Sequence, residues 1–529
     1  MKKELLTVKD LTITIAGNQV VNDITFNLKK GETLCLVGES GSGKSLSALA
    51  VMGLLPEVAT VKAAQLSFEG AELQTMDEES RRKLRGAQMS MIFQEPMTSL
   101  NPVIKVGEQV AEVLEIHTNL SKKERRDKVV ELFKKVQIKE PERRYSDYPF
   151  QMSGGQRQRV MIAMALAMSP KLLIADEPTT ALDVTVQGEI LDLIKNLQAE
   201  MGMAVMFITH DFGVVQEMAD HVAVMQFGEI VEQGTVKQVM EKPKHAYTKK
   251  LLAAMPKMNP TASTAPIAES DFLTVKNVDK TFMVKEGGFF GQLKPFQALK
   301  NINFSMQKGE TLGVVGESGC GKSTLSRCIT RLYDLDGGEV LFMGDDMAGL
   351  HGDALTASRK QMQMIFQDPF SSLNPRMKVG DIVAEGLKAH KVMGKKERTA
   401  YVKELLQDCG LPEDAAQRYP HQFSGGQRQR IGIARALALK PALIIADEPV
   451  SALDVSVQKQ ILELMENLKE KYSLSYLFIS HDLRVVSEVC DRVLVMRDGE
   501  IVEQGAVKDV FTKPKHRYTQ QLLDAVPQG

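Results

Sequence analysis

Two glycine-rich segments carry the residue types that bind a phosphate chain. Residues 38–45 read GESGSGKS and residues 316–323 read GESGCGKS, and both match the pattern G-x-x-x-x-G-K-[ST]. Each segment follows a short apolar run and precedes a helical pattern, so its backbone N–H groups and the helix N-terminus would face an anion. The lysine would reach the β- and γ-phosphates, and the final serine would bind Mg²⁺ through its hydroxyl. These residues are Lys44 and Ser45 in the first segment, and Lys322 and Ser323 in the second.

Two adjacent carboxylates close an apolar run in each half of the chain. Asp176–Glu177 follows LLIA, and Asp447–Glu448 follows LIIA. Ionised carboxylates are costly away from water, so we expect a buried strand to end in two of them only when they have a task. Beside a triphosphate, the aspartate would hold the Mg²⁺ shell, and the glutamate would orient and deprotonate the attacking water.

The tetrapeptide SGGQ occurs at 153–156 and at 424–427, in both places 23 residues before the carboxylate pair. A serine followed by two glycines at the start of a helix is suited to an anion. The N-cap hydroxyl, the exposed N–H groups and the positive end of the helix dipole all favour negative charge there.

These motifs recur because the chain is an internal duplication. Three further pairs follow the same order: MIFQEPMTSLNP with MIFQDPFSSLNP, MFITHDF with LFISHDL, and KPKHAYT with KPKHRYT. The offset between copies falls from 278 residues at the glycine loops (38 and 316) to 271 at the SGGQ segments (153 and 424). We expect a first domain at 1–254 and a second at 271–529. The Pro-, Ala-, Thr- and Ser-rich stretch 255–270 is predicted to be a flexible linker.

The order of the segments predicts an α/β fold for each copy. Short β-rich segments come first, then a strand that ends in the glycine loop, then helical stretches that alternate with apolar runs such as LLIAD. Apolar runs between helices indicate buried parallel strands. The helical patterns at about 100–150 and 373–420 indicate an insert. We expect a P-loop parallel-sheet core with an antiparallel β subdomain and a helical insert in each half.

The composition excludes several classes of protein. The 529 residues include 66 Lys+Arg and 67 Asp+Glu, and this balance argues against a general nucleic-acid binder. No apolar run approaches the roughly 18 residues of a membrane span, and charges interrupt the start MKKELLTVKD, so we expect a cytoplasmic chain. The five cysteines form no C-x-x-C pair, which favours free thiols in a reducing compartment.

With these motifs in place, the chain resembles a tandem ATP-binding-cassette (ABC) ATPase over nearly all of both halves. The resemblance implies ATP and Mg²⁺ as ligands and two domains arranged head to tail, each ATP lying between the glycine loop of one half and the SGGQ of the other. It implies that Glu177 and Glu448 are catalytic, together with His210, His481, Gln94 and Gln367. The implied Mg²⁺ ligands are Ser45, Gln94 and Asp176 in one site, and Ser323, Gln367 and Asp447 in the other. One nucleotide site would comprise Gly38, Glu39, Ser40, Gly41, Ser42, Gly43, Lys44 and Ser45, closed by Ser424, Gly425, Gly426 and Gln427. The other would comprise Gly316, Glu317, Ser318, Gly319, Cys320, Gly321, Lys322, Ser323 and Thr324, closed by Ser153, Gly154, Gly155 and Gln156.

Other residues are expected to distinguish or connect the two sites. Asp183 and Asp454 match the loop through which the sites of the family communicate. The family usually stacks an aromatic residue on adenine 20–25 residues before the glycine loop. The first half has none in IAGNQVVNDI, whereas Phe296 is a candidate in the second. Because both halves keep the glutamate and the SGGQ, we expect both sites to hydrolyse ATP.

The runs FQ[DE]PxxSLNP and KPKHxYT look like those of the ATPases of bacterial oligopeptide, dipeptide and nickel importers. A fused pair of this length is similar to the Yej-type ATPases of microcin C uptake. This implies a peptide or peptide-like cargo, two integral membrane permease subunits and a periplasmic or lipoprotein substrate-binding protein. It also implies a peripheral location on the cytoplasmic face of the bacterial inner membrane. Residues around 94–102 and 367–375 are candidates for gripping the permeases. The cysteines that hold an iron–sulfur cluster in some relatives are missing, so no cluster is expected.

Other functions were weighed against this one. Glutathione and nickel remain alternative cargoes. A twin-cassette translation factor acting on ribosomes would resemble its family in a long, charged helical linker, whereas this linker is short and nearly uncharged. A DNA-repair ATPase would need a coiled coil or zinc modules between glycine loop and SGGQ, and the chain has neither the length nor the cysteines for them. Transport is therefore the favoured interpretation.

Overall fold

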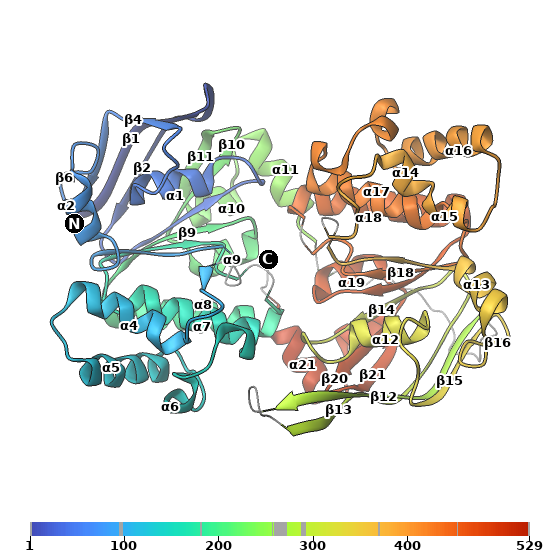
Figure 1. Ribbon diagram of the computed structural model, residues 1–529. Coiled ribbons are helices and arrows are strands. Elements are labelled where there is room, and N and C mark those ends of the chain that lie inside the picture. Colours follow the sequence, from blue (N-terminus) through green and yellow to red (C-terminus); the bar gives the residue numbers. More distant parts are fainter. Residues whose placement is uncertain are drawn as a thin grey trace.

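The computed structural model describes residues 3–94, 99–179, 182–256, 258, 272–286, 292–368, 371–451 and 453–526. Two halves of the same architecture lie side by side, the first coloured blue to green and the second yellow to red (Figure 1). Of the predicted linker 255–270, only residues 255, 256 and 258 are among the described residues, so its flexibility stays a prediction.

Each half begins with an antiparallel β subdomain, as the sequence predicts. In the first half the strand order is β2-β1-β5-β6, and β4 also pairs with β1. These strands are β1 (Glu4–Ile15), β2 (Asn18–Lys29), β4 (Ala59–Lys62), β5 (Gln65–Phe68) and β6 (Ala71–Glu72). In the second half the order is β13-β12-β15-β16. These strands are β12 (Leu273–Glu286), β13 (Gln292–Met306), β15 (Gly337–Phe342) and β16 (Asp345–Asp346).

The core of each half is a mostly parallel sheet. Its order is β11-β10-β3-β9-β8-β7 in the first half and β17-β18-β19-β14-β20-β21 in the second, and only the β10–β11 and β20–β21 pairs are antiparallel. The first sheet contains β3 (Thr33–Val37), β7 (Met89–Ile92), β8 (Leu172–Asp176), β9 (Ala204–Thr209), β10 (His221–Gln226) and β11 (Glu229–Thr235). The second contains β14 (Thr311–Val315), β17 (Met362–Ile365), β18 (Leu443–Asp447), β19 (Ser475–Ile479), β20 (Arg492–Arg497) and β21 (Glu500–Ala506).

Helices cover the sheets and form the predicted insert at the side of each half (Figure 1). The helices of the first half are α1 (Lys44–Met52), α2 (Glu78–Leu84), α4 (Val106–His117), α5 (Lys122–Lys135), α6 (Pro141–Arg144), the 3₁₀ turn η1 (Pro149–Gln151), α7 (Gly154–Leu166), α8 (Val184–Met201), α9 (Phe212–Met218), α10 (Val236–Glu241) and α11 (Ala246–Ala254). Those of the second half are α12 (Lys322–Ile329), α13 (Gly352–Gln361), α14 (Val379–Val383), α15 (Glu385–Ala389), α16 (Lys395–Asp408), the 3₁₀ turns η3 (Glu413–Gln417) and η4 (Pro420–Gln422), α17 (Gly425–Leu437), α18 (Val455–Tyr472), α19 (Leu483–Val489), α20 (Val507–Thr512) and α21 (Arg517–Asp524).

The strand that ends in the carboxylate pair is buried on both faces, because successive side chains point to opposite sides of a sheet. In β8, Leu172 and Ile174 pack into the core shared with the β subdomain and α1. Leu173 and Ala175 pack into the core shared with the helical insert. This two-sided burial explains the unbroken apolar run in the sequence, and it fixes the strand that positions Asp176.

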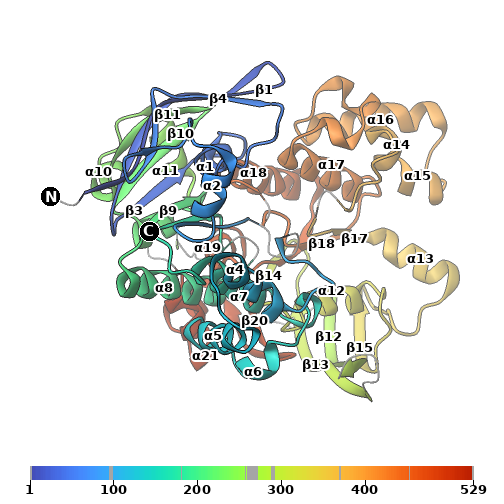
Figure 2. The same ribbon diagram turned by 60° about the vertical axis from the view of Figure 1, so that its left-hand side comes forward.

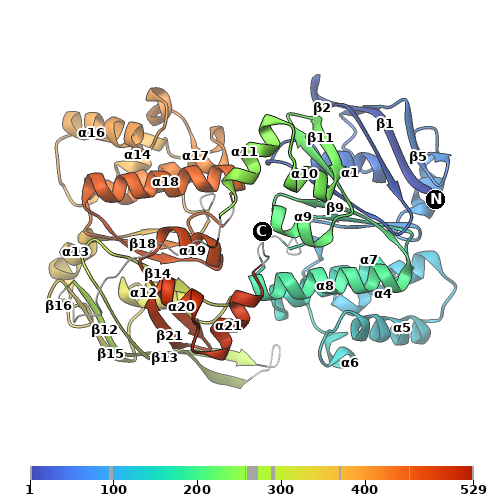
Figure 3. The same ribbon diagram turned by 180° about the vertical axis from the view of Figure 1, so that it is seen from behind.

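The halves meet along the face that carries the strand ends. Helix α11 of the first half contacts α18 of the second (Figure 3), and the Lys459 ammonium donates a hydrogen bond to the Ala253 carbonyl at 3.4 Å. The β12–β13 hairpin and β15 lie at the outer edge of the second half (Figure 2). Within the described ranges, no helix is both long and apolar enough to cross a membrane.

In each half a cysteine side chain fills the same space between the sheet and a helix. The cysteine comes from the strand β3 in the first half, but from the end of helix α19 in the second. In the first half Cys35 on β3 lies in the core and the residue after α9 is Ala219. In the second half the equivalent positions are Gly313 on β14 and Cys490 after α19. A Cβ at Gly313 would lie 3.1 Å from the Cys490 Sγ and 2.9 Å from Val486. The space therefore admits one thiol and not two.

We expect Gly313→Cys to lower the free energy of unfolding of the second half by about 1–3 kcal/mol, because it overpacks this space. Adding Cys490→Ala recreates the arrangement of the first half and should recover most of the loss. Denaturant unfolding of the single and double variants measures both effects. A double variant no more stable than Gly313→Cys alone would contradict the account.

Candidate functional site

The glycine loops leave their strands along a path that only glycine can follow. Gly38 has φ +156°, and a Cβ there would lie 2.2 Å from the Met225 carbonyl oxygen on β10. Gly316 repeats this with φ +149° and the same 2.2 Å approach to the Met496 carbonyl oxygen. A side chain at either position would collide with backbone, so each loop is held tightly against the neighbouring strand.

The lysine of each loop is buried with its ammonium turned into the loop. Lys44 Nζ donates to the carbonyl oxygens of Gly38 at 2.7 Å and of Glu39 at 2.9 Å. Lys322 makes the same two bonds, to Gly316 at 2.6 Å and Glu317 at 2.9 Å. Burial lowers the pKa of Lys44, although the charges of Glu177, Asp454, Asp176 and Glu39 oppose that shift.

The final serine of each loop meets the aspartate at the end of an apolar strand that lies two positions away in the sheet. Ser45 Oγ donates to Asp176 Oδ1 at 3.0 Å, and Ser323 Oγ donates to Asp447 Oδ1 at 3.3 Å. Burial raises the pKa of Asp176 to about 6, with a further contribution from the charge of Glu177. The structure thus brings together the hydroxyl and the carboxylate that the sequence assigns to one Mg²⁺ ion.

The glutamate of each pair leaves its strand in a left-handed conformation. Glu177 has φ +46° and Glu448 has φ +47°. Each backbone N–H still bonds to the next strand, Glu177 to the Ile208 carbonyl and Glu448 to the Ile479 carbonyl, both at 2.9 Å. A non-glycine residue in this region is strained. The same strain in both copies turns the carboxylate out of the sheet toward the predicted glutamine and histidine.

The glutamine and the histidine both contact that carboxylate. Gln94 Nε2 donates to Glu177 Oε2 at 3.0 Å, and His210 Nδ1 lies 3.3 Å from Glu177 Oε1. Burial disfavours the charged imidazole of His210, but its bond to Glu177 and the charges of Glu177, Asp211 and Asp454 outweigh burial and raise the pKa of His210.

The second half repeats this cluster. Gln367 Nε2 donates to Glu448 Oε2 at 2.9 Å, and His481 Nδ1 lies 3.2 Å from the same oxygen. Burial alone would raise the pKa of Glu448, but His481, Lys322 and Gln367 together lower it. Each glutamate is therefore oriented from two sides, as a residue that must aim at a water requires.

Each SGGQ opens a helix, and its second glycine has a packing role that the sequence does not reveal. Ser153 caps α7 and Ser424 caps α17, each through a capping box with the glutamine. A Cβ on Gly155 would lie 2.6 Å from Val186 Cγ1, and one on Gly426 would lie 2.3 Å from Val457 Cγ1. The start of α17 is therefore packed directly against the start of α18, and that of α7 against α8.

The first turn of α18 touches the glycine loop of the other half. The backbone N–H of Ser40 donates to Asp454 Oδ1 at 2.9 Å, and the Ser456 hydroxyl donates to the Glu39 carboxylate. Because Gly426 packs against Val457 in this same turn, the start of α17 adjoins the element that contacts the first-half loop. Among the described residues, however, the hydrogen bonds of Ser424 stay within its own half.

The opposite pairing shows the same order of elements. Asp183 stands before α8 and lies near enough for its negative charge to favour the protonated forms of His481 and Cys320, residues of the second half. The structure thus places each predicted communication loop beside the glycine-loop end of the other half.

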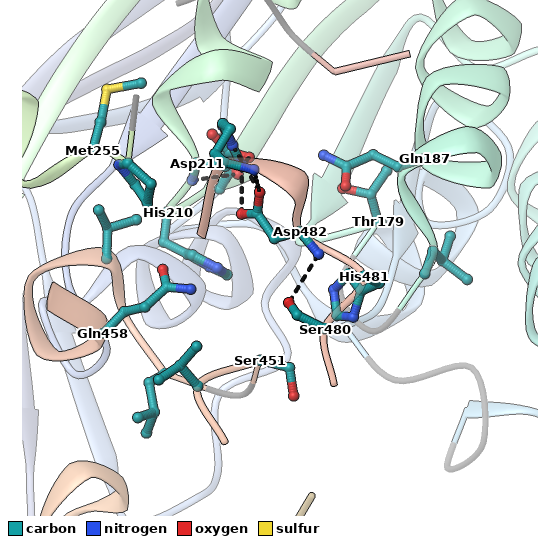
Figure 4. Close-up of a pocket in the computed structure, with 17 residues that line it drawn as sticks. Thr179, Gln187, His210, Asp211, Met255, Ser451, Gln458, Ser480, His481 and Asp482 are labelled. Atoms are coloured by element: carbon teal, nitrogen blue, oxygen red, sulfur yellow. Dashed lines mark hydrogen bonds and ion pairs between the residues drawn. The ribbon is translucent and has the colours of Figure 1, made fainter. Parts of the chain in front are cut away.

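A cavity of about 120 Å³ lies between the two predicted sites and is lined from both halves (Figure 4). Asp211 and Asp482, which follow the two histidines, lie close together in its lining (Figure 4). Arg484 Nε and Nη2 donate to the two oxygens of Asp482 at 3.1 Å, and Nη2 also reaches Asp211 Oδ2 at 3.3 Å. One guanidinium of the second half therefore joins the two histidine loops.

A second cavity, of about 310 Å³, lies over the glycine loop of the second half. Its lining combines Lys322, Ser323, Gln367 and Glu448 with two aromatic residues, Phe282 and Phe296. These two residues face each other as cross-strand partners on β12 and β13. The equivalent pair on β1 and β2 is Ile15 and Asn18, so the first half has no aromatic platform there.

The sequence missed residues that matter only across an interface or across a hairpin. Arg484 stands where the first half has Gly213, and this difference between the copies was the available signal. For Ser456 the sequence offered no signal, because a serine in the first turn of a helix is common. Phe282 pairs with the predicted Phe296, and the register of the hairpin is what reveals it.

The residues present fit a Mg-nucleotide. The loop lysine is a buried cation whose hydrogen bonds go to uncharged oxygens, so it can neutralise phosphate charge. The paired serine hydroxyl and aspartate are hard oxygen donors of the kind that Mg²⁺ prefers. The cavity of the second half places aromatic side chains beside this phosphate end, where a nucleobase would stack.

The chain is similar in sequence to known proteins over most of its length. The ABC transporter family profile matches residues 21–180 and 299–451. The profile of the oligopeptide/dipeptide transporter C-terminal region matches 231–280 and 502–529. The chain is 46% identical to the peptidoglycan transport ATP-binding protein YejF of Agrobacterium fabrum, over 98% of this chain and 96% of that protein. It is 47% identical to the glutathione import ATP-binding protein GsiA of Escherichia coli, over 99% of this chain and 89% of that protein. A dimeric ATP-binding cassette bound to ADP and Pi is 33% identical, covering 45% of this chain and 99% of that one, with a TM-score of 0.40.

We expect Arg484→Gln to lower the stability of the interface by about 2 kcal/mol, because Asp211 and Asp482 would then face each other without the shared cation. Asp211→Asn should cost less in that background than in the wild type, since it removes the repulsion. A double-mutant cycle of thermal unfolding measures this coupling.

The control moves the cation to the other half. Gly213→Arg combined with Arg484→Gly should recover stability, because position 213 stands where Arg484 does in the pseudo-symmetric half. Additive effects in the cycle, together with no recovery by the transposed arginine, would show that the bridge contributes nothing.

Proposed function

Because this chain belongs to the ABC transporter family and hydrolyses ATP to power transport, we propose that it serves a bacterial importer of peptides or peptide-like compounds. The observation that carries this proposal is the oligopeptide/dipeptide transporter C-terminal region, which matches in both halves. The cargoes named for the relatives, peptidoglycan and glutathione, both contain peptide bonds, and this supports a peptide-like cargo. Glutathione is the second candidate, on the strength of the 47% identity to its import protein.

The proposed nucleotide sites are the two clusters described above. Lys44 and Lys322 would bind the phosphate chain, and the loop N–H groups would bind its oxygens. Ser45 with Asp176, and Ser323 with Asp447, would hold Mg²⁺, which when bound neutralises charge on the phosphates. The remaining members of the glycine loops would contribute backbone contacts, and Phe296, with Phe282, would stack on adenine in the second half.

Hydrolysis requires a water in line with the γ-phosphate. We assign its orientation and deprotonation to Glu177 and Glu448, whose left-handed backbone aims the carboxylate out of the sheet. Gln94 and Gln367 hold these carboxylates by hydrogen bonds. His210 and His481, which contact the same carboxylates, would donate to the γ-phosphate as negative charge develops there. A raised histidine pKa favours that donor role.

Each site would be completed by the other half. Ser424, Gly425, Gly426 and Gln427 would close over the nucleotide bound by Lys44, and Ser153, Gly154, Gly155 and Gln156 over that bound by Lys322. The contacts of Asp454 and Ser456 with the first-half glycine loop support this pairing. A helix N-terminus brought against the γ-phosphate adds a positive dipole end to the site.

The partners would be two integral membrane permease subunits and a substrate-binding protein, with the ATPase on the cytoplasmic face of the bacterial inner membrane. The segment 99–105, which precedes α4, supports this assignment. Gln109 ties it to α4 through bonds with Asn101 and Ile104, and the loop leaves Val103 78% exposed. Val103 and Ile104 are both exposed, and such adjacent apolar side chains are suited to receive a partner helix.

We expect Glu177→Gln combined with Glu448→Gln to keep ATP binding and permease association but to abolish turnover, because the water loses its base while the phosphate site stays intact. Steady-state ATPase assays and co-purification from membranes measure the two properties. Turnover near the wild-type rate would remove the catalytic assignment. Association with ribosomes in place of permeases would remove the importer assignment.

We expect Ser424→Arg to reproduce the defect of Lys44→Ala, because bulk and charge would stand where the helix start must meet the nucleotide of the other half. Combining these two changes should cost little more than either alone, since both act on one site. Pairing Ser424→Arg with Lys322→Ala should be worse, because it damages both sites. ATPase rates with permeases present decide the matter; redundancy of Ser424→Arg with Lys322→Ala would mean that each half closes its own site.

A further inference from the structure

The C-terminal segment of each half reaches back to its own glycine loop. Tyr247 on α11 is 6% exposed, and its hydroxyl oxygen accepts the backbone N–H of Glu39 at 3.2 Å. Tyr518 on α21 is 3% exposed and accepts the N–H of Glu317 at 3.1 Å. Both tyrosines come from the KPKHxYT run, so the two copies make the same contact independently.

The rest of the run fixes where this tyrosine stands. His245 caps α11 by accepting the Tyr247 N–H at Nδ1, at 3.3 Å. The Glu232 carboxylate on β11 accepts the N–H groups of Lys244 and His245, at 2.8 and 3.1 Å. The second half repeats every bond with His516, Glu503 and Lys515. The sheet edge, through this carboxylate, thus determines the start of the helix and with it the direction of the tyrosine.

The peptide that the tyrosine holds also positions the phosphate-binding lysine. The peptide between Gly38 and Glu39 donates its N–H to Tyr247 at 3.2 Å, and its carbonyl oxygen, that of Gly38, accepts the Lys44 ammonium at 2.7 Å. Burial and the neighbouring Glu39 raise the pKa of Tyr247 to about 12, so the hydroxyl keeps its proton at neutral pH. A rotation of the peptide between Gly38 and Glu39 would break both of these bonds at once.

We propose that Tyr247 and Tyr518 are positioning residues that hold the two glycine loops in the nucleotide-binding conformation, and that the KPKHxYT segment thereby sets the ATP affinity of each half. The inference rests on the proposed nucleotide sites. Without the hydroxyl, the Glu39 N–H is left without its acceptor in the binding conformation, so other loop conformations gain population. The apparent affinity falls in proportion to the fraction of loops that remain competent.

The test uses the full chain carrying Glu177→Gln and Glu448→Gln, so that binding is measured without hydrolysis. Titration with a fluorescent ATP analogue should show that Tyr247→Phe weakens one of the two sites about 3- to 10-fold, as expected for the loss of one hydrogen bond. Tyr518→Phe should weaken the other site, and the double variant both. Phenylalanine keeps the packed ring, so the hydroxyl alone is tested.

The matched control is Tyr476→Phe, on β19 of the second half. It removes another buried hydrogen bond, which the Tyr476 hydroxyl donates to the Met465 carbonyl at 3.2 Å. It should lower stability without changing ATP affinity. Unchanged affinity in Tyr247→Phe and Tyr518→Phe overturns the inference, as does an equal loss in the control. A parent chain that binds no analogue refutes the nucleotide sites themselves, which is a separate outcome.

Two further measurements keep the inference falsifiable if a variant is unstable. Amide hydrogen exchange at the Glu39 peptide should be faster in Tyr247→Phe than in the parent, with no change at the same peptide in Tyr518→Phe. In chains that retain both glutamates, KM for ATP should rise several-fold while kcat changes little. A fall in kcat at constant KM would assign the tyrosines to another role and overturn the proposal.

Discussion

A buried lysine held by the carbonyl oxygens of its own loop is the feature on which the rest of each half depends. Its charge is removed from water, so the protein must keep the loop rigid and surround it with compensating groups. Gly38 and Gly316 allow the loop to pass against the next strand, where any side chain would strike a backbone oxygen. The aspartate that ends a strand two positions away in the sheet then lies beside the serine of the loop.

The two halves solve these requirements with the same backbone but with different side chains. In the same packed space, the first half has Cys35 and Ala219, whereas the second half has Gly313 and Cys490 at the corresponding positions. Phe282 and Phe296 provide an aromatic platform where the first half has Ile15 and Asn18. Arg484 supplies a cation between Asp211 and Asp482 that the first half, with Gly213, does not supply. Duplication followed by such exchanges preserves each core while making the two sites unequal.

Contacts across the interface connect one of these differences, Arg484, to the histidines and glutamates of both halves. Arg484 links the loops that carry His210 and His481, and these histidines contact the two glutamates. The backbone N–H of Glu39 donates to Tyr247 in the C-terminal segment of its own half, and its carboxylate accepts the hydroxyl of Ser456 in the second half. A movement of either helix α11 or helix α18 therefore reaches the same loop. The two clusters are thus joined by contiguous polar contacts that cross the interface.

The sequence by itself determined the duplication, the α/β class, the glycine loops and the residues that gather around them, because each of these depends on short runs whose spacing is set by local backbone geometry. The resemblance to the ABC family assigned Gln94, Glu177 and His210 to one cluster, and the structure brings their side chains together. Only the tertiary structure decided that the second glycine of SGGQ is needed against Val186 and Val457, that Arg484 bridges the halves, and that Tyr247 and Tyr518 hold the loops. Such contacts join residues that are 31 to 273 positions apart, and neither periodicity nor local propensity carries information about which distant side chain will occupy the space.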